Sequence, residues 1–229
     1  MTGAVHAELS VLEGENLRVE RPTTGQRAAD ILRTRILQGE LRAGTQFAEQ
    51  RLAAILGVSR NTLREAFQIL IGERLVVHEP HRGVFVRRIT APEVSDIYTF
   101  RRLVECAALA RPHGFDHLAH MRAAAGDGDV AAGRLAWGEV GTADLRFHLA
   151  VVTAGGSTRL DQAVTVLFAE LRLAFQLVAD PAVLHAPFLV RNAEILALAE
   201  AGDHQQASIA MRSYLDAAEA LIIANIPAR

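Results

Sequence analysis

Two arginines one helical turn apart, Arg60 and Arg64, have the side chains and the spacing needed to bind nucleic acid. Residues four apart on a helix point to the same side, and a guanidinium donates paired hydrogen bonds to guanine O6 and N7 or to a phosphate. The other side of this segment has apolar residues at helical spacing, which predicts a half-buried helix. These residues are Leu63, Ala66, Phe67 and Leu70. On the spacing alone, the segment could also be an ordinary helical hairpin with a solvated arginine face.

The elements that must position this pair are short. A first helix is predicted at 49–56 and is interrupted by Gly57. Ser59 is suited to cap the second helix, because its hydroxyl can accept a hydrogen bond from the free amides of the first turn. Two short helices, a tight glycine turn and a polar face on the second helix describe a helix-turn-helix.

A β-hairpin is predicted directly after the second helix. Two β-prone runs, at 75–78 and 84–87, flank a turn at 80–83, and a hairpin in this place is a wing. The glycine of the turn allows a positive φ and a close approach of the backbone to DNA. Without the preceding helices, a plain surface turn would be the better interpretation. The candidate contacts in the turn are His81, Arg82 and Gly83.

The C-terminal part carries polar residues on otherwise apolar helical stripes. Asp144 and His148 are four residues apart, Asn192 lies on a second stripe and Tyr214 on a third. Each could be a satisfied core polar group, but four of them on three helices favour a shared polar cavity. A carboxylate–imidazole pair could also serve acid/base or metal chemistry. No nucleophile motif, phosphate loop or complete ligand set accompanies it in the sequence.

Charge divides the chain in two. Residues 22–90 contain 11 Arg and 6 acidic residues, whereas residues 91–229 contain 11 Arg and 16 acidic residues. A basic part joined to an acidic part is typical of a nucleic-acid-binding domain fused to a domain that does not contact DNA. No apolar run approaches the ~18 residues of a membrane span, and the N-terminus does not resemble a secretory signal. The single cysteine, Cys106, is predicted to be a small buried residue of the core. A lone cysteine cannot form an internal disulfide, which fits a reducing cytoplasm.

The periodicity predicts a mainly α chain. Residues 1–21 are expected to be a flexible arm. Residues 22–90 are expected to form the winged helix-turn-helix domain, beginning with a helix at 24–39, and residues 91–229 an all-α bundle that follows a linker at 91–93. The helices of the bundle are predicted at 93–110, 115–125, 130–137, 143–152, 158–178, 182–201 and 204–223.

The segment GVSRNTLREAFQIL, residues 57–70, resembles the recognition segment of GntR-type bacterial transcription regulators. The resemblance continues through the glycine of the wing, and it implies that several of these residues contact an operator. The sequence Asn61-Thr62-Leu63 departs from the commoner Thr-Pro-Val, which is expected to change the base preference but not the docking mode. The implied contacts before the wing are Gln50, Ser59, Arg60, Asn61, Thr62 and Arg64.

The helical half resembles the FCD ligand-binding domain of the FadR subgroup of these regulators. Arg101 and Glu105 match the early R-x3-E pattern of that domain. The resemblance implies a pocket in which polar donors bind a small organic acid while apolar walls accept its tail. The expected effector-binding residues are Arg101, Asp144, His148, Asn192 and Tyr214.

Metal-binding members of the subgroup use Asp-x3-His followed by two later histidines. Asp144 and His148 match the first pair, but Asn192 and Tyr214 occupy the later positions. A carboxamide and a phenol are poor substitutes for imidazole, so we expect no cofactor, or at most a weakly bound Zn²⁺ or Ni²⁺ on the first pair. His185 could in principle compensate, although its reach is long.

These features predict a transcription regulator that represses its target genes. We expect it to be a cytoplasmic homodimer without enzymatic activity or membrane contact. Each subunit would read one half of an inverted repeat in double-stranded DNA, and the effector would lower operator affinity by favouring another arrangement of the bundle. The alternative is a metal-dependent or acid/base enzyme that uses Asp144 and His148.

Overall fold

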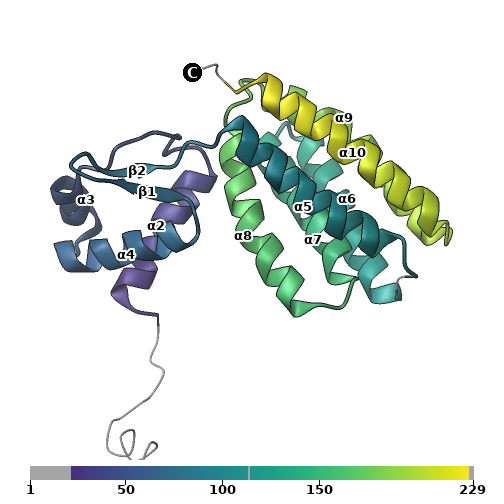
Figure 1. The fold of residues 1–229 in the computed structure, drawn as a ribbon, viewed down its shortest axis with the longest axis horizontal. Helices are drawn as coiled ribbons and strands as arrows, with labels where there is room; N and C mark the ends of the chain where they lie inside the picture. The colour runs from purple at the N-terminus through teal and green to yellow at the C-terminus, as the bar shows by residue number, and fades with distance from the viewer. Residues whose placement is uncertain (1–21, 113, 227–229) are drawn as a thin grey trace, which may run out of the picture.

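The computed structural model describes residues 22–112 and 114–226. The arm predicted at 1–21 lies outside the described residues. Within them the chain forms a smaller N-terminal unit with a two-stranded hairpin and a larger helical unit (Figure 1). The predicted fold class, a winged helix-turn-helix followed by an all-α bundle, is confirmed.

The N-terminal unit places three helices around one hairpin. The elements are α2 (Thr24–Leu37), α3 (Glu49–Leu56), α4 (Arg60–Gly72), β1 (Val76–Glu79) and β2 (Gly83–Val86). The two strands pair antiparallel, with Val76 opposite Val86. Their apolar side chains and those of the helices form one core. The predicted stripe on α4 is buried in it and consists of Leu63, Ala66, Phe67 and Leu70.

Local backbone chemistry forms the turn between α3 and α4. Gly57 ends α3 in the left-handed conformation, with φ of 64°, which glycine adopts without the steric cost that a Cβ would add. Ser59 then caps α4, because its hydroxyl accepts a hydrogen bond from the Thr62 backbone N–H at 3.1 Å. The predicted interruption at Gly57 and the predicted cap at Ser59 are both confirmed.

The predicted linker at 91–93 is wrong, because these residues form the first turn of α5 (Ala91–Leu109). The carboxylate of Glu93 accepts hydrogen bonds from the Thr90 backbone N–H at 2.8 Å and from the Thr90 hydroxyl at 2.7 Å. Pro92 lies in the first turn, where a missing N–H costs nothing. The helix therefore starts immediately after the wing strand and its short exit.

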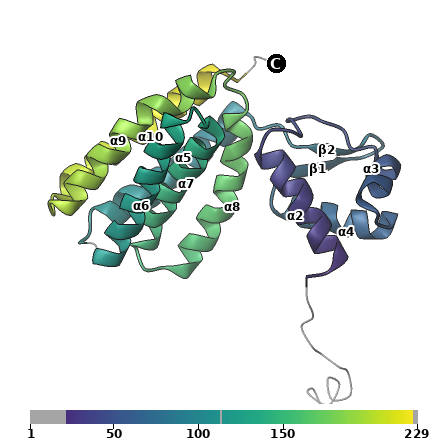
Figure 2. The same cartoon turned by 180° about the vertical axis from the view of Figure 1, so that it is seen from behind.

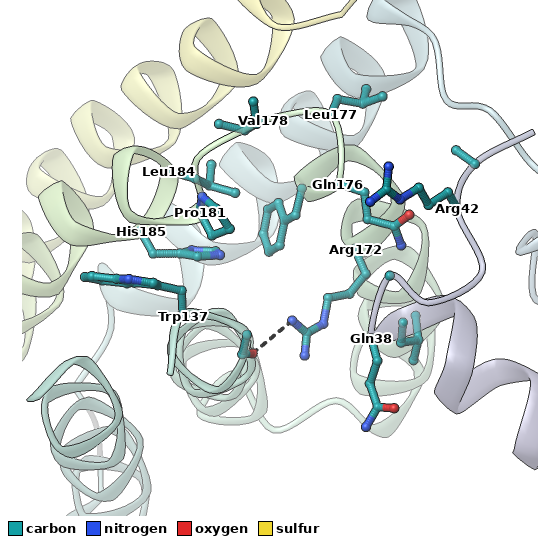
Figure 3. A pocket seen from close by; sticks show the side chains of 16 residues that line it. Gln38, Arg42, Trp137, Arg172, Gln176, Leu177, Val178, Pro181, Leu184 and His185 are labelled. Carbon is teal, nitrogen blue, oxygen red and sulfur yellow. Dashed lines mark hydrogen bonds between the residues drawn. The ribbon is translucent and has the colours of Figure 1, made fainter. Parts of the chain in front are cut away.

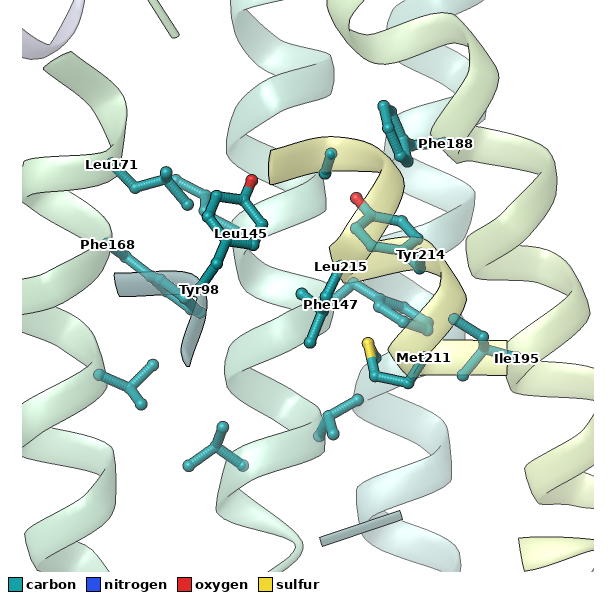
Figure 4. Close-up of a cluster of buried hydrophobic side chains, with 14 of the residues drawn as sticks. Tyr98, Leu145, Phe147, Phe168, Leu171, Phe188, Ile195, Met211, Tyr214 and Leu215 are labelled. Carbon is teal, nitrogen blue, oxygen red and sulfur yellow. The ribbon is translucent and has the colours of Figure 1, made fainter. Parts of the chain in front are cut away.

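The helical unit is built from α5 and five further helices. These are α6 (Phe115–Gly133), α7 (Trp137–Thr153), α8 (Thr158–Phe175), α9 (Pro181–Glu200) and α10 (His204–Ala224). Side chains from α5 and from α7 through α10 meet in one core (Figure 4). Cys106 is buried there as a free thiol, as predicted.

Several predicted helix boundaries in the bundle are wrong: the helices predicted at 115–125 and 130–137 are replaced by one helix, α6, and α7 begins well before the predicted residue 143. The expected break at 126–128 does not occur, since α6 continues through Gly126 and Gly128. A helical glycine costs only about 1 kcal/mol relative to alanine, and packing of α6 against neighbouring helices outweighs this cost. A Cβ at Gly128 would lie 3.2 Å from the Leu189 side chain of α9. Trp137 begins α7 and does not end a helix, because the chain turns at Leu135, whose φ is 58°.

Helix α9 alone among the described helices has the length and apolar composition of a membrane span. One side of it is nevertheless buried within the bundle, where it packs against α6, α7 and α10. This is the pattern of a core helix in a folded domain.

Helix α8 lies on the side of the bundle that faces the N-terminal unit in both views (Figures 1 and 2). Its Leu173 is fully buried and belongs to the core of the N-terminal unit. The side-chain amide of Gln176 donates a hydrogen bond to the Ile36 carbonyl of α2 at 2.7 Å. The two units are therefore packed together through α8.

Candidate functional site

The polar face of α4 points to solvent. Arg60 and Asn61 are exposed, and the side chain of Arg64 has 67% of its surface accessible. The Nε atom of Arg64 lies 3.5 Å from a carboxylate oxygen of Glu49, at the start of α3. An exposed ion pair of this length contributes little free energy, so Arg64 is available to bind another anion or a base edge.

Two of the other predicted contact residues are engaged at the start of α4. The hydroxyls of Ser59 and Thr62 lie 2.8 Å apart, and Ser59 also accepts from the Thr62 amide. Ser59 therefore stabilises the start of α4. If Ser59 also contacts DNA, its hydroxyl must bind the DNA and Thr62 at the same time. Gln50 lies exposed in the first turn of α3.

The tip of the wing is held in a defined conformation. His81 and Gly83 both have positive φ, of 62° and 102°. The guanidinium of Arg82 pairs with Glu79 and lies 5.4 Å from the centre of the Phe85 ring. The Gln46 side chain donates to the Arg82 carbonyl at 2.6 Å, a contact that sequence periodicity did not indicate. The three predicted tip residues are thus presented together.

Inside the helical unit, two of the predicted polar residues, Asn192 and Tyr214, meet a third, Asp144. One of its carboxylate oxygens accepts hydrogen bonds from the Asn192 side-chain amide at 2.8 Å and from the Tyr214 hydroxyl at 2.7 Å. These side chains come from α7, α9 and α10. Polar groups on separate stripes therefore meet one another, and the predicted cavity between them stays a prediction.

His148 links this group to a buried ion pair on α5. Its Nδ1 lies 2.6 Å from Glu105, whose other carboxylate oxygen accepts from Arg101 Nε at 2.7 Å. Its Nε2 lies 3.8 Å from the Asp144 carboxylate. Glu105 was not among the predicted effector residues, although its spacing of four from Arg101 was the available signal. We call these six residues the polar cluster: Arg101, Glu105, Asp144, His148, Asn192 and Tyr214.

Three buried atoms of the polar cluster have no hydrogen-bond partner. They are Nη2 of Arg101, Nε2 of His148 and Oδ1 of Asn192. Burial of a polar atom without a partner costs free energy, so such atoms indicate a place where water or a ligand can bind. Burial alone would raise the pKa of Glu105, but the charge of Arg101 and the hydrogen bonds from Arg101 and His148 outweigh burial and hold this pKa below its ordinary value.

Comparisons with known proteins match both units. Residues 24–86 match the family model described as bacterial regulatory proteins, gntR family, and residues 96–217 match the FCD domain model. A transcriptional regulator GntR from Rhodococcus sp. RHA1 has a similar structure, with a TM-score of 0.83 and 40% sequence identity over 89% of this chain and 99% of that one.

Two relatives by sequence are also transcription regulators. An HTH-type transcriptional regulator from an unstable DNA locus of Streptomyces ambofaciens is 32% identical over 81% of this chain and 79% of its own length. The chain belongs to the GntR family. The gluconate operon transcriptional repressor of Bacillus licheniformis is 38% identical over 41% of this chain, and the match spans 38% of that repressor. The names of these relatives describe transcription regulators. They give no support to the alternative that this GntR-family chain is a metal-dependent or acid/base enzyme.

The donors in the polar cluster of this GntR protein do not form a complete metal site. Asn192 directs its amide nitrogen, which cannot ligate a metal, towards Asp144. Burial and the nearby Asp144 charge raise the pKa of Tyr214 well above its ordinary value, so the phenol stays protonated. Among the described residues, no group of three or more His, Cys, Asp or Glu side chains could hold a metal ion. A weak site on Asp144 and His148 remains a prediction.

His185, the residue that could have compensated, does not join the polar cluster. Its ring packs edge-on against the Phe175 ring, with 5.2 Å between the ring centres. His185 also lines a cavity beside α8 (Figure 3). Burial lowers the pKa of His185 below its ordinary value, so its imidazole is neutral at pH 7.

Proposed function

We propose that this GntR-family regulator is a cytoplasmic homodimer that represses transcription from an inverted-repeat operator, and that a small organic acid bound in the FCD domain releases it. The basic charge of residues 22–90 and the acidic charge of 91–229 support a division of labour between the units. A twofold dimer would present two copies of α4 to two half-sites, as inverted repeats require.

The operator is read by α4 and the wing. Arg60 and Arg64 donate to guanine edges or phosphates in the major groove, and the wing tip approaches the backbone. The solvent-facing guanidinium pair on a capped helix is the observation that carries this proposal. The proposed contacts are Gln50, Ser59, Arg60, Asn61, Thr62, Arg64, His81, Arg82 and Gly83.

The effector is bound by the polar cluster, and the three unpartnered atoms there support this placement. A carboxylate entering the cluster would compete with Asp144 for the donors on Asn192 and Tyr214. Exchange of these hydrogen bonds would shift α9 and α10 relative to α7. A ligand that binds one arrangement better than the other changes operator affinity by that difference.

The test is footprinting of the purified chain on genomic DNA, followed by titration of the bound fragment with the organic acids that the neighbouring genes process. We expect a protected inverted repeat and release by one of these acids. Release should be weakened in Tyr214→Phe, which removes one donor and keeps the ring. Binding without sequence preference at moderate salt, or release unaffected in Tyr214→Phe, would contradict the proposal.

A further inference from the structure

A cavity of about 580 Å³ lies where the two units meet, and none of the residues that line it belongs to the polar cluster. From the N-terminal unit it is lined by the end of α2 and the following loop, including Gln38 and Arg42. From the helical unit it is lined by the start of α7, the end of α8 and the start of α9 (Figure 3). This volume is within the range of small-molecule sites in proteins, about 300–1,000 Å³.

Arg172 of α8 is a half-buried cation in this cavity. Its guanidinium donates hydrogen bonds to the Gly138 carbonyl at 3.3 Å and to the Thr142 hydroxyl, both on α7. Among the described residues no carboxylate forms a direct ion pair with it, and the charge of Asp144 acts on it only from a longer distance. Its burial lowers the pKa below the ordinary arginine value. A desolvated guanidinium without a direct ion-pair partner favours binding of an anion.

The wall beside Arg172 is apolar and aromatic. Trp137 and His185 lie on one side of the cavity, Arg42 lies on the other, and Arg172 projects between them (Figure 3). Phe175 and Leu184 complete the apolar lining. Aromatic rings of this kind pack against the ring or chain of an organic ligand.

The backbone of α7 is adapted to this arrangement at Gly141. A Cβ at that position would lie 2.7 Å from Nε2 of His185 and 3.3 Å from Nη1 of Arg172. Only glycine therefore lets both side chains approach the helix without displacement. Opposite them, Oε1 of Gln176 is buried without a partner while the amide of the same residue holds Ile36 of α2.

We propose that this interdomain cavity binds a small carboxylate with an apolar ring or chain, at a site separate from the polar cluster. The carboxylate pairs with Arg172, and the apolar part packs against Trp137 and Phe175. Because Arg42 and Gln38 of the N-terminal unit line the same cavity, the bound acid contacts both units. Occupancy then stabilises one relative placement of the DNA-binding and FCD domains.

Trp137 provides a direct readout, because it is the single tryptophan of the chain. Benzoate is the probe, and benzamide is the matched control with the same ring and no charge. We expect benzoate to change the fluorescence of Trp137 in the DNA-free, full-length protein and to release or absorb heat on titration, with benzamide binding at least about tenfold more weakly. The assay needs no operator, so its outcome is independent of the proposed repressor function.

Variants locate the site. Arg172→Gln should weaken benzoate binding by about tenfold or more, Arg172→Lys should restore part of it, and Arg122→Gln, an exposed arginine of α6, should have no effect. Gly141→Ala favours the helix yet displaces His185 and Arg172, and should also weaken binding. The proposal is wrong if benzoate changes neither fluorescence nor heat, if benzamide binds equally well, or if Arg172→Gln binds benzoate like the parent chain.

Discussion

The guanidinium of Arg87, directly after β2, lies 2.6 Å from the carboxylate of Glu170 on α8. Arg87 also pairs with Glu93 in the first turn of α5, so it bridges the two helices at the domain junction. Glu170 has only 8% of its side chain exposed, and it lies one turn from Leu173, which is buried in the core of the DNA-binding domain. The domains are thus joined by packing and by a mostly buried ion pair as well as by the chain.

Replacement of Glu170 by alanine should loosen this junction. Arg87 would lose one of two carboxylate partners while it stays mostly buried, and we expect a loss of about 1–3 kcal/mol in the free energy of unfolding. Urea unfolding measures the loss, and limited proteolysis near residue 90 reports the loosened junction. The control is Glu139→Ala, which removes an exposed pair with Arg134 and should change stability by less than about 0.5 kcal/mol. Equal effects of the two substitutions would contradict this role of Glu170.

Arg60→Ala and Arg64→Ala should each weaken binding to the cognate operator by about 1–3 kcal/mol. Both side chains are exposed, so the folded structure should be unaffected. Gel-shift titration at fixed salt on cognate and scrambled duplexes measures the change. Arg134→Ala, an exposed arginine in the helical unit, is the matched control. If both α4 variants bind the cognate duplex as the parent does, then α4 is not the reading element.

Glu105 should make stability depend on pH. Its pKa is below the ordinary value in the folded chain, so its charge contributes stability that is fully present above the ordinary value of 4.5 and is lost as pH falls through the lower folded value. Glu105→Gln leaves the buried Arg101 without a counter-charge and should cost roughly 3–5 kcal/mol at neutral pH. The difference between parent and variant should shrink below pH 4.5. Urea unfolding across pH measures it, and a difference independent of pH would refute this assignment.

Introducing two histidines should create a metal site in the polar cluster. The double substitution Asn192→His and Tyr214→His adds two imidazoles to Asp144 and His148, which completes the ligand set of metal-binding relatives. We expect Zn²⁺ affinity to rise at least about 100-fold, measured by competition with a chelating dye. His148→Ala in the same background should remove most of the gain. Tight binding by the parent chain would show that Asn192 and Tyr214 do not prevent metal binding.

Local sequence determined the helix-turn-helix and the wing. A left-handed glycine, a serine cap and an apolar stripe act within a few residues of one another, so Gly57, Ser59 and the stripe of α4 could be recognised without knowledge of the rest of the fold. The polar residues on apolar stripes were also visible, because burial of a polar group demands a partner wherever the helix packs.

Only the tertiary structure decided which partners the polar residues on the apolar stripes contact. The pairing of His148 with Glu105, the continuous helix through Gly128 and the placement of Leu173 in the neighbouring domain all depend on contacts between segments far apart in the chain. Helical periodicity shows which face of a helix is buried but not which helix covers it. For the same physical reason, only the packed structure places the unpaired charge of Arg172 in a cavity shared by both domains.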